Sequence, residues 1–227
     1  MSDAGLFESG IYTVPEIAEL VQAPQWLVRV WVEGKKNRQD PVIQNQLGRV
    51  AGKLAVSFTN LMELRFVALF HNAGVRLNEI RSIMDEVKRS LSHPHPFATK
   101  TVFRTDGKKI VAEILLKHGV QQIFDLKSKN YEMLEVMKKT LLDDVVYDPA
   151  GNAKAWYPRR ALAPHVVVNP VISFGRPVLQ KSQIPTNTIA RAVKAEGSAR
   201  IVAGLYDISE KQVREAVAFE ENLRTAA

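Results

Sequence analysis

The sequence predicts a mainly α-helical protein built from three small modules. Apolar residues recur at helical spacing through residues 10–91 and again through residues 184–223. The His-Pro-His-Pro run at residues 93–96 separates the first helical stretch from the middle of the chain, because proline disfavours helix for the residue before it. We therefore expect a helical unit over residues 10–92, a small α+β unit with β-hairpins over residues 96–158, and a three-helix unit over residues 165–227.

Composition excludes several classes of protein. The chain has 227 residues, 46% of them hydrophobic, which is enough for packed cores. No window approaches the roughly 20 apolar residues of a membrane span, and the amino terminus is acidic and polar, unlike a signal peptide. The absence of cysteine excludes disulfides, thiolate zinc sites and cysteine nucleophiles, and fits a reducing compartment. We expect a cytoplasmic protein without a membrane segment.

The first unit begins with two short helices. Thr13 is a good N-cap, and Pro15 and Glu16 suit the first turn of a helix. The Ala23-Pro24 step ends this helix, and helical spacing resumes over residues 25–32. Two short helices joined by so tight a turn form a helix-turn-helix candidate.

The rest of the first unit alternates between irregular and helical segments. Residues 34–53 lack helical spacing and are expected to form a loop or a β-wing. Residues 59–70 carry apolar side chains on nearly all sides, which predicts a buried helix ended by Asn72 and Gly74. A further helix is expected over residues 77–91.

The middle unit carries two hairpin signals and one helical pattern. Asp106-Gly107 predicts a hairpin between residues 101–104 and 109–115. Helical spacing occurs next over residues 130–142. The turn-forming residues 149–152 predict a second hairpin, with strands at residues 145–147 and 153–157.

Residues 159–164 are expected to form a linker to the last unit. There, Ile184-Pro185-Thr186 begins a helix that runs through about Glu196 and stops at Gly197. Ser198 begins a second helix that reaches Tyr206, and Ser209 introduces a third through Leu223. The second and third helices again have helix-turn-helix proportions.

Positive charge is unevenly distributed. The net charge is +7, yet residues 1–34 hold one base against five acids. Residues 35–53 hold five bases against one acid, and a second excess lies towards the carboxyl end. The first cluster coincides with the expected wing, where cations would neutralise DNA phosphates. For the second cluster we favour the alternative interpretation, a solvated surface.

Two stretches carry a family resemblance. The first resembles the MerR-type winged helix-turn-helix, with every element in the same order. It comprises the run Tyr-Thr-Val-Pro-Glu-Ile-Ala-Glu-Leu at residues 12–20, the segment 26–31, the basic wing, and the motifs at residues 58–64 and 74–80. The second, in the tail, resembles a small trihelical family of uncharacterised function. It comprises Ile-Ser-Phe-Gly-Arg-Pro-Val-Leu at residues 172–179, then Ile184-Pro185-Thr186, Gly197 and Ser209-Glu210. Members of that family act as VapB-like antitoxins beside PIN-like ribonuclease toxins.

The resemblance to MerR-type domains implies which residues contact double-stranded DNA. One set would lie on the second helix and the wing, and Tyr12 and Thr13 would donate to phosphate at the start of the first helix. Trp31 is better explained as a core residue. The implied DNA-binding residues are Tyr12, Thr13, Gln25, Trp26, Arg29, Lys35, Lys36, Arg38 and Arg49.

The chain departs from both families. MerR regulators that sense metals use cysteine or histidine ligands after a long dimerising helix, whereas this chain has no cysteine. In the trihelical family a small residue and an arginine usually precede the Ile-Pro step, where this chain has Ser182-Gln183. We therefore expect no metal sensing.

No pattern indicates catalysis. His93 and His95 suggest a metal pair, but they lie without a nearby carboxylate in sequence and better mark a turn between units. Asp143-Asp144 and Glu220-Glu221 are adjacent carboxylates that point in different directions, so we interpret them as surface charge. No nucleophile elbow or glycine-rich phosphate loop is present. We expect a non-enzymatic protein with no catalytic residue, no metal and no cofactor.

The segment Phe174-Gly175-Arg176-Pro177 combines a glycine, which allows an unusual turn, with a proline, which fixes the next step. It would form either a clamp for a partner or a structural tie between the middle unit and the tail. The resemblance implies that a basic segment occludes the acidic site of a PIN-like toxin. The candidate partner-binding residues are Arg159, Arg160, Phe174 and Arg176.

Together these features predict the DNA-binding antitoxin of a type II toxin-antitoxin pair. It would bind operator DNA as a homodimer, repress its own transcription and neutralise a PIN-like ribonuclease toxin. The alternative is a MerR-like transcription regulator whose middle unit binds a ligand and which has no toxin partner.

Overall fold

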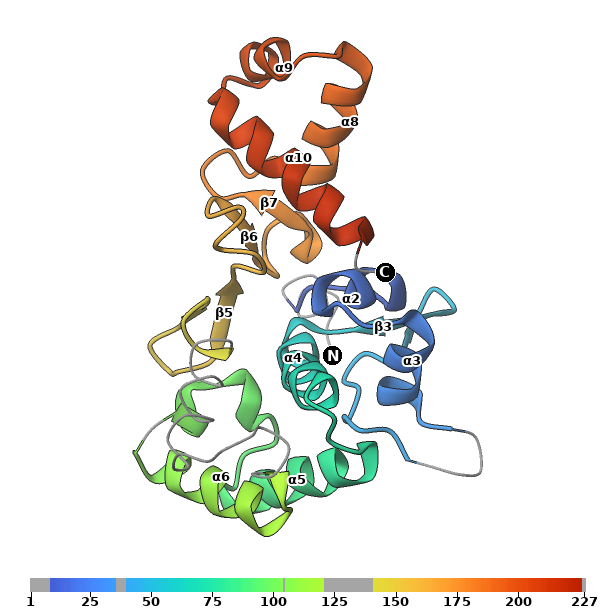
Figure 1. Ribbon diagram of the computed structural model, residues 1–227, viewed down its shortest axis with the longest axis vertical. Coiled ribbons are helices and arrows are strands. Elements are labelled where there is room, and N and C mark those ends of the chain that lie inside the picture. The colour runs from blue at the N-terminus through green and yellow to red at the C-terminus, as the bar shows by residue number, and fades with distance from the viewer. Residues whose placement is uncertain (1–8, 36–39, 104, 121–140, 226–227) are drawn as a thin grey trace.

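The structure, a computed structural model, describes residues 9–35, 40–103, 105–120 and 141–225. The molecule is elongated (Figure 1). The three carboxyl-terminal helices form one end, and residues 77–117 form the other. The amino-terminal helices lie between these two ends, next to the end of the last helix.

Two short helices and a three-stranded antiparallel sheet form the amino-terminal part, which confirms the predicted tight turn. Strands β2 and β3 form a hairpin, called the wing below, at the end of the segment expected to be a loop or a β-wing. The strand order is β1-β3-β2, with Tyr12 opposite Val56 and Arg49 opposite Leu54. Only the turn Ala51-Gly52 separates β2 from β3. The elements are β1 (Tyr12–Thr13), α2 (Val14–Val21), α3 (Gln25–Glu33), β2 (Arg49–Val50) and β3 (Lys53–Val56).

Local chemistry explains where α2 and α3 begin and end. The backbone amide and the hydroxyl of Thr13 both donate to the Glu16 carboxylate, at 2.8 and 2.7 Å, so the start of α2 has partners for its polar groups. Gln22 ends α2 in a left-handed conformation with φ of 56°. Pro24, at the N-cap of α3, cannot continue the first helix.

The long helix α4 (Phe58–Asn72) is buried on nearly every side and forms the centre of the molecule. Ser57 caps it by accepting a hydrogen bond from the Asn60 amide. Leu61, Leu64 and Phe66 are all fully buried, as expected of a helix that is apolar all round. Together with α5 (Leu77–Ser90), α4 confirms the two helices predicted for this region.

A buried carboxylate links α4 to its neighbours. Glu63 is fully buried, accepts a hydrogen bond from the Asn60 side chain at 2.8 Å, and lies 3.2 Å from His95 Nδ1 and 3.7 Å from Lys88 Nζ. The fold thus supplies His95 with a carboxylate that is distant in sequence. Among the described residues, no group of three or more His, Asp or Glu side chains is arranged to hold a metal ion.

The prediction of a hairpin around Asp106-Gly107 is wrong. After the short 3-10 turns Pro96–Ala98 and Lys100–Phe103, residues Thr105–Lys117 form the helix α6. Its buried positions Val111, Ile114 and Leu115 match helical spacing. Asp106 and Gly107 lie in its first turn, where the helix dipole favours an acid. The helix predicted over residues 130–142 lies almost entirely outside the described residues.

A second antiparallel sheet has the order β4-β5-β6-β7. The hairpin of its first two strands confirms the prediction for residues 145–157, with a bulge between Val146 and Tyr147. The last two strands are missing from the predicted three-helix unit, although Val166–Val168 is a run of three buried valines, which favours a strand. The strands are β4 (Val145–Tyr147), β5 (Ala153–Trp156), β6 (Val166–Val168) and β7 (Pro177–Leu179).

Three helices complete the chain and confirm the predicted tail helices. Gly197 ends the first of them with φ of 68°, and Ser198 caps the second. Ile189, Val202 and Phe219, one from each helix, are fully buried. The helices are α8 (Thr186–Glu196), α9 (Ala199–Tyr206) and α10 (Glu210–Thr225).

The fold class is therefore an α+β mixture rather than mainly α. The described part of the chain holds eight α-helices, about half of its residues, and two small antiparallel sheets. One continuous hydrophobic core runs from Tyr12 to Leu223. The division into units 10–92, 96–158 and 165–227 stays a prediction. None of the described helices combines the length and apolar character needed to cross a membrane.

Candidate nucleic-acid interface and partner surface

Helix α3 presents one apolar and one exposed face. Leu27, Val28 and Trp31 are buried, so Trp31 is a core residue as expected. Gln25 and Arg29 point outward, and Trp26 is 65% exposed. An indole this exposed is unusual for a side chain that prefers burial. The exposed face therefore combines an aromatic ring, an amide and a guanidinium, which suits contacts with nucleic acid.

Glu33, which the sequence analysis did not single out, joins α3 to the wing. One of its carboxylate oxygens lies 2.7 Å from Arg49 Nη2 and the other 3.3 Å from Arg29 Nη1. Arg49 also donates to the carbonyl of Gly52 at 3.2 Å. Exposed ion pairs add little stability, but these contacts bring two guanidinium groups to one carboxylate, with one net positive charge among the three side chains.

The other predicted wing cations are only partly described. Lys35 is exposed at the end of α3. Lys36 and Arg38 lie outside the described residues. Lys53, in β3, is exposed on the same hairpin as Arg49, and the sequence analysis did not include it among the DNA-binding candidates.

The hydroxyl groups of Tyr12 and Thr13 both lie against other parts of the protein. Tyr12 is 2% exposed, so its hydroxyl does not reach the surface, and burial raises its pKa. The hydroxyl is therefore not placed to donate to a phosphate, and the assignment of Tyr12 to the DNA-binding residues stays a prediction. The Thr13 hydroxyl donates to the Glu16 carboxylate. We leave both residues out of the candidate interface.

Arg159, which the sequence predicted to bind a partner, forms hydrogen bonds within the protein, and these are called the Arg159 brace below. Its Nε donates to the Asn222 side chain at 2.7 Å, and its two terminal nitrogens donate to the carbonyls of Leu20 and Glu19 at 3.2 and 3.3 Å. Burial lowers the pKa of its guanidinium. Because its donors connect α2 with α10, Arg159 does not present a free guanidinium to a partner.

Arg160 and the segment around Phe174 lie at the surface. The Arg160 guanidinium stacks over Tyr157 at 4.9 Å and donates to the carbonyl of Asp143 at 2.9 Å. Phe174 is 55% exposed, and its neighbour Arg176 is exposed as well. Val171 in the same segment is 61% exposed, so this loop carries an apolar patch beside a cation.

The backbone explains why Phe174 points outward. Ser173, Phe174 and Gly175 form a turn in which all three have positive φ, of 48°, 58° and 87°. Such a conformation is unfavourable for residues other than glycine. The Ile11 amide donates to the Phe174 carbonyl at 3.2 Å, so the amino-terminal part holds the turn. The segment is therefore a structural tie that also exposes an aromatic ring.

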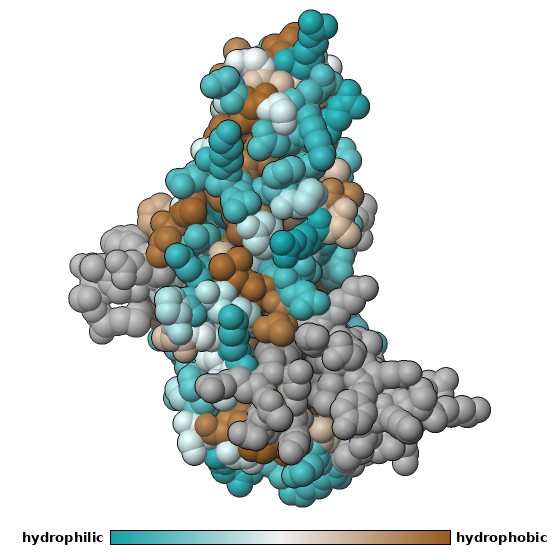
Figure 2. Space-filling model, turned by 90° about the vertical axis from the view of Figure 1, so that its left-hand side faces the viewer, coloured by the Kyte–Doolittle hydropathy of each residue, from teal (hydrophilic) through white to brown (hydrophobic). Residues whose placement is uncertain are grey.

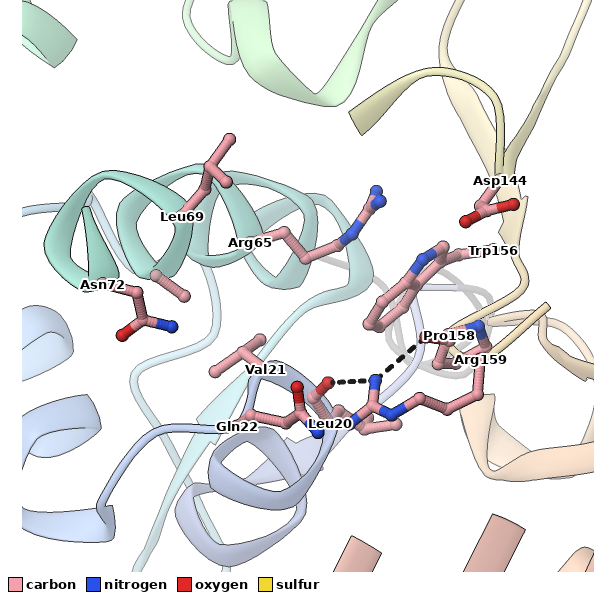
Figure 3. A pocket seen from close by; sticks show the side chains of 11 residues that line it. Leu20, Val21, Gln22, Arg65, Leu69, Asn72, Asp144, Trp156, Pro158 and Arg159 are labelled. Atoms are coloured by element: carbon pink, nitrogen blue, oxygen red, sulfur yellow. Dashed lines mark hydrogen bonds between the residues drawn. The ribbon is translucent and has the colours of Figure 1, made fainter. Parts of the chain in front are cut away.

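A pocket of about 410 Å³ lies between α2, α4 and the end of β5 (Figure 3). Arg65 reaches from α4 and stacks over the Trp156 ring at 4.3 Å. Burial lowers the pKa of Arg65 to about 10, and Asp144 and Tyr147 partly offset this. Burial also raises the pKa of Asp144. Gln22 and Asn72 line the pocket as well, so it offers polar groups on an apolar wall.

Comparison with known proteins gives two kinds of similarity. Residues 166–219 match the family described as "Protein of unknown function (DUF433)". This part comprises β6, β7, α8, α9 and most of α10. The crystal structure of Rv2018 from Mycobacterium tuberculosis has the same fold, with a TM-score of 0.69 over 91% of this chain and 96% of that chain, at 19% sequence identity.

One relative carries a functional name. The protein of Mycobacterium tuberculosis (strain ATCC 25618 / H37Rv) named "Putative antitoxin VapB45" is 23% identical, over 93% of this chain and 94% of its own length. Over nearly its whole length, the chain is thus similar to a protein named as an antitoxin, and its carboxyl-terminal part is similar to a family without an assigned function.

Proposed function

We propose that this protein is the DNA-binding antitoxin of a type II toxin-antitoxin pair, a non-enzymatic regulator that binds its own operator as a homodimer and neutralises a PIN-like ribonuclease toxin. The similarity to a protein named as an antitoxin supports the first part of this proposal. The MerR-like arrangement of two short helices and a wing supports operator binding.

The observation that carries DNA binding is the group formed by Trp26, Arg29, Glu33 and Arg49. Helix α3 is short and exposed along one side, so it can enter a major groove. Glu33 holds the guanidinium of Arg29 on the helix and that of Arg49 on the wing in one region of the surface. In this proposal Arg29 reads a base edge, and Lys35 and Arg49 contact phosphates.

Two substitutions distinguish base reading from phosphate contact. The probe is the DNA that precedes the protein's own coding sequence, compared with unrelated DNA by fluorescence anisotropy. Arg29→Ala should weaken specific binding by about 5- to 150-fold, as expected for one lost base contact. Lys35→Ala should weaken binding to both DNAs and lower the slope of log affinity against log salt by about 1.

The control is Arg191→Ala, which removes an exposed cation on α8, at the end of the molecule formed by the three carboxyl-terminal helices. It should change neither affinity nor slope. If Arg29→Ala and Lys35→Ala both leave the DNase footprint unchanged, the amino-terminal part is not the DNA reader and the proposal fails.

For the toxin, we propose a surface made of Phe174, Arg176 and Arg160. The apolar ring would provide burial, and the exposed cations would complement the acidic metal-binding site of a PIN-like nuclease. The test is co-purification with the product of the neighbouring gene. Phe174→Asn keeps a residue that tolerates positive φ, so loss of the complex would reflect the lost ring. Trp26→Ala should retain the complex. A neighbour that never co-purifies with the unmodified protein contradicts the toxin assignment.

The second candidate function is a ligand-responsive regulator without a toxin. The pocket that Arg65 and Trp156 line favours it, because apolar walls with a few polar groups are typical of small-molecule sites. Asn72→Trp places a large side chain at the exposed edge of this pocket. If this substitution changes operator affinity in cell extract but not with purified protein, a small molecule regulates the protein and the second candidate is favoured.

A further inference from the structure

Helix α9 exposes an apolar stripe at the end of the molecule farthest from α5 and α6. Ile201 is 49% exposed and Leu205 is 65% exposed. These residues are four positions apart and therefore lie one above the other on the same helix face. Val202, about 100° further round the helix from Ile201, is fully buried in the core that α9 shares with α8 and α10. Figure 2 shows hydrophobic atoms among the hydrophilic ones at this upper end of the molecule.

Gly204 lies within the same exposed face. It is an interior residue of α9 with an ordinary helical backbone, so no positive φ requires a glycine there. A Cβ atom at Gly204 would meet no other atom of the chain within 4 Å. Since glycine is a poor helix former, neither the backbone nor the packing of this chain explains its presence. The missing side chain at Gly204, beside the stripe of Ile201 and Leu205, would let the backbone of another helix approach closely.

The charges at the two ends of α9, beside the apolar stripe, favour a second copy of the same helix as the partner. Arg200 lies at the start of α9 and Asp207 just after its end, and both are exposed. In the part of the chain that the structure describes, neither side chain has an ion-pair partner. A second α9 that runs antiparallel to the first across a two-fold axis would place Arg200 beside Asp207 of its partner, twice. It would also align the helix dipoles in opposite directions, which is favourable.

From this self-complementarity we infer that α9 is a homodimer contact in which Ile201 and Leu205 pack over Gly204 of a second copy, with Arg200 and Asp207 at the rim. A contact related by a two-fold axis uses the same patch on both subunits. This inference rests on the homodimer of the proposed function and deepens it, because it names the surface through which two copies associate.

The first test compares two substitutions of exposed leucines in the full-length protein. Leu205→Glu would place a carboxylate in the buried centre of the contact and should weaken dimerisation by about 100-fold or more. Leu162→Glu makes the same change at a leucine that is 44% exposed and lies outside α9, and it should leave the dimer intact. Analytical ultracentrifugation over a concentration series measures both, and circular dichroism checks that each variant is folded.

The second test uses charge reversal. In Arg200→Glu, each contact would pair two acids, and in Asp207→Lys, each would pair two bases, so either variant alone should dimerise about 10-fold more weakly. An equimolar mixture restores both attractive pairs in a heterodimer. The mixture should therefore regain dimers at concentrations where each variant is monomeric.

An unmodified protein that stays monomeric at every concentration overturns the inference. So does a dimer that survives Leu205→Glu, or a mixture of the two charge variants that stays monomeric. If Leu205→Glu removes the complex with the toxin while the unmodified chain is a monomer, α9 binds the toxin and not itself. Because Arg29 and Phe174 variants test the proposed function separately, its failure would not be confused with these outcomes.

Discussion

The Tyr12 ring lies directly against the α-carbon of Gly175. A Cβ atom added to Gly175 would be 2.6 Å from Tyr12 Cζ and would collide with the hydroxyl oxygen. Gly175 also has φ of 87°, which other residues rarely adopt. The contact joins the first strand of the chain to the strained turn that exposes Phe174.

Gly175→Ala should therefore destabilise the protein by about 2–4 kcal/mol, because the steric clash adds to the cost of the positive φ. Urea unfolding monitored by circular dichroism measures the change in free energy of unfolding. The matched control is Gly197→Ala, where φ is 68° but nothing lies within 4 Å of the added Cβ. The control should lose only about 1 kcal/mol. Equal losses for the two variants would contradict the close packing on Tyr12.

Tyr12→Phe is expected to stabilise the protein or leave it unchanged. Among the described residues, the buried Tyr12 hydroxyl has no hydrogen-bond partner, and an unsatisfied buried polar group costs about 1–3 kcal/mol. The same unfolding measurement applies. Operator affinity should stay unchanged, since Tyr12 lies outside the interface. A marked loss of affinity without loss of stability would restore Tyr12 as a phosphate donor.

Stability should fall at alkaline pH in part because of Tyr147. Burial raises the pKa of Tyr147 from 10.0 to about 12. The folded state therefore holds this proton more tightly than the unfolded state. The contribution of the neutral Tyr147 to the free energy of unfolding is complete below pH 10 and is lost as the pH rises from 10 towards 12. Tyr147→Phe should show a smaller loss over this interval. Parallel pH curves for variant and unmodified protein would rule out this contribution.

Glu33→Gln should increase affinity for unrelated DNA. It removes a negative charge between Arg29 and Arg49 and so raises the net positive charge of the interface by one. Specific affinity should gain less, because the two guanidinium groups lose the carboxylate that draws them together. Fluorescence anisotropy at several salt concentrations measures the ratio of the affinity for the operator to the affinity for unrelated DNA. A ratio equal to that of the unmodified protein would indicate that Glu33 does not position the arginines.

Local signals predicted most of the helices. Thr13, Pro24, Gly197 and Ser198 begin or end helices where expected, since capping and proline geometry depend on neighbouring residues. The same local reasoning failed at Asp106-Gly107, where the buried apolar spacing of α6 overrides a turn signal. The strands β6 and β7 were not predicted because each has only three residues and their pairing, with β5 and with each other, spans connections without a hairpin signal.

The candidate site was only partly predictable. Exposure of Arg29 and Trp26 is a consequence of helical spacing on α3. The burial of Tyr12 and the internal bonds of Arg159 depend on segments that are distant in sequence, so no local pattern reveals them. The role of Glu33 likewise requires the hairpin that brings Arg49 next to α3.

The Arg159 brace has a consequence for the spacing of operator half-sites. One guanidinium bonds α2 to α10, and α2 packs against α3, so these hydrogen bonds restrict how α3, the proposed recognition helix, moves relative to the carboxyl-terminal helices. A two-fold axis that relates two tails would then also set the distance and angle between two recognition helices. Dimeric helix-turn-helix proteins bind half-sites at a separation fixed by such geometry. A substitution that removes the hydrogen bonds of Arg159 should thus allow the dimer to bind operators whose half-sites have a different spacing.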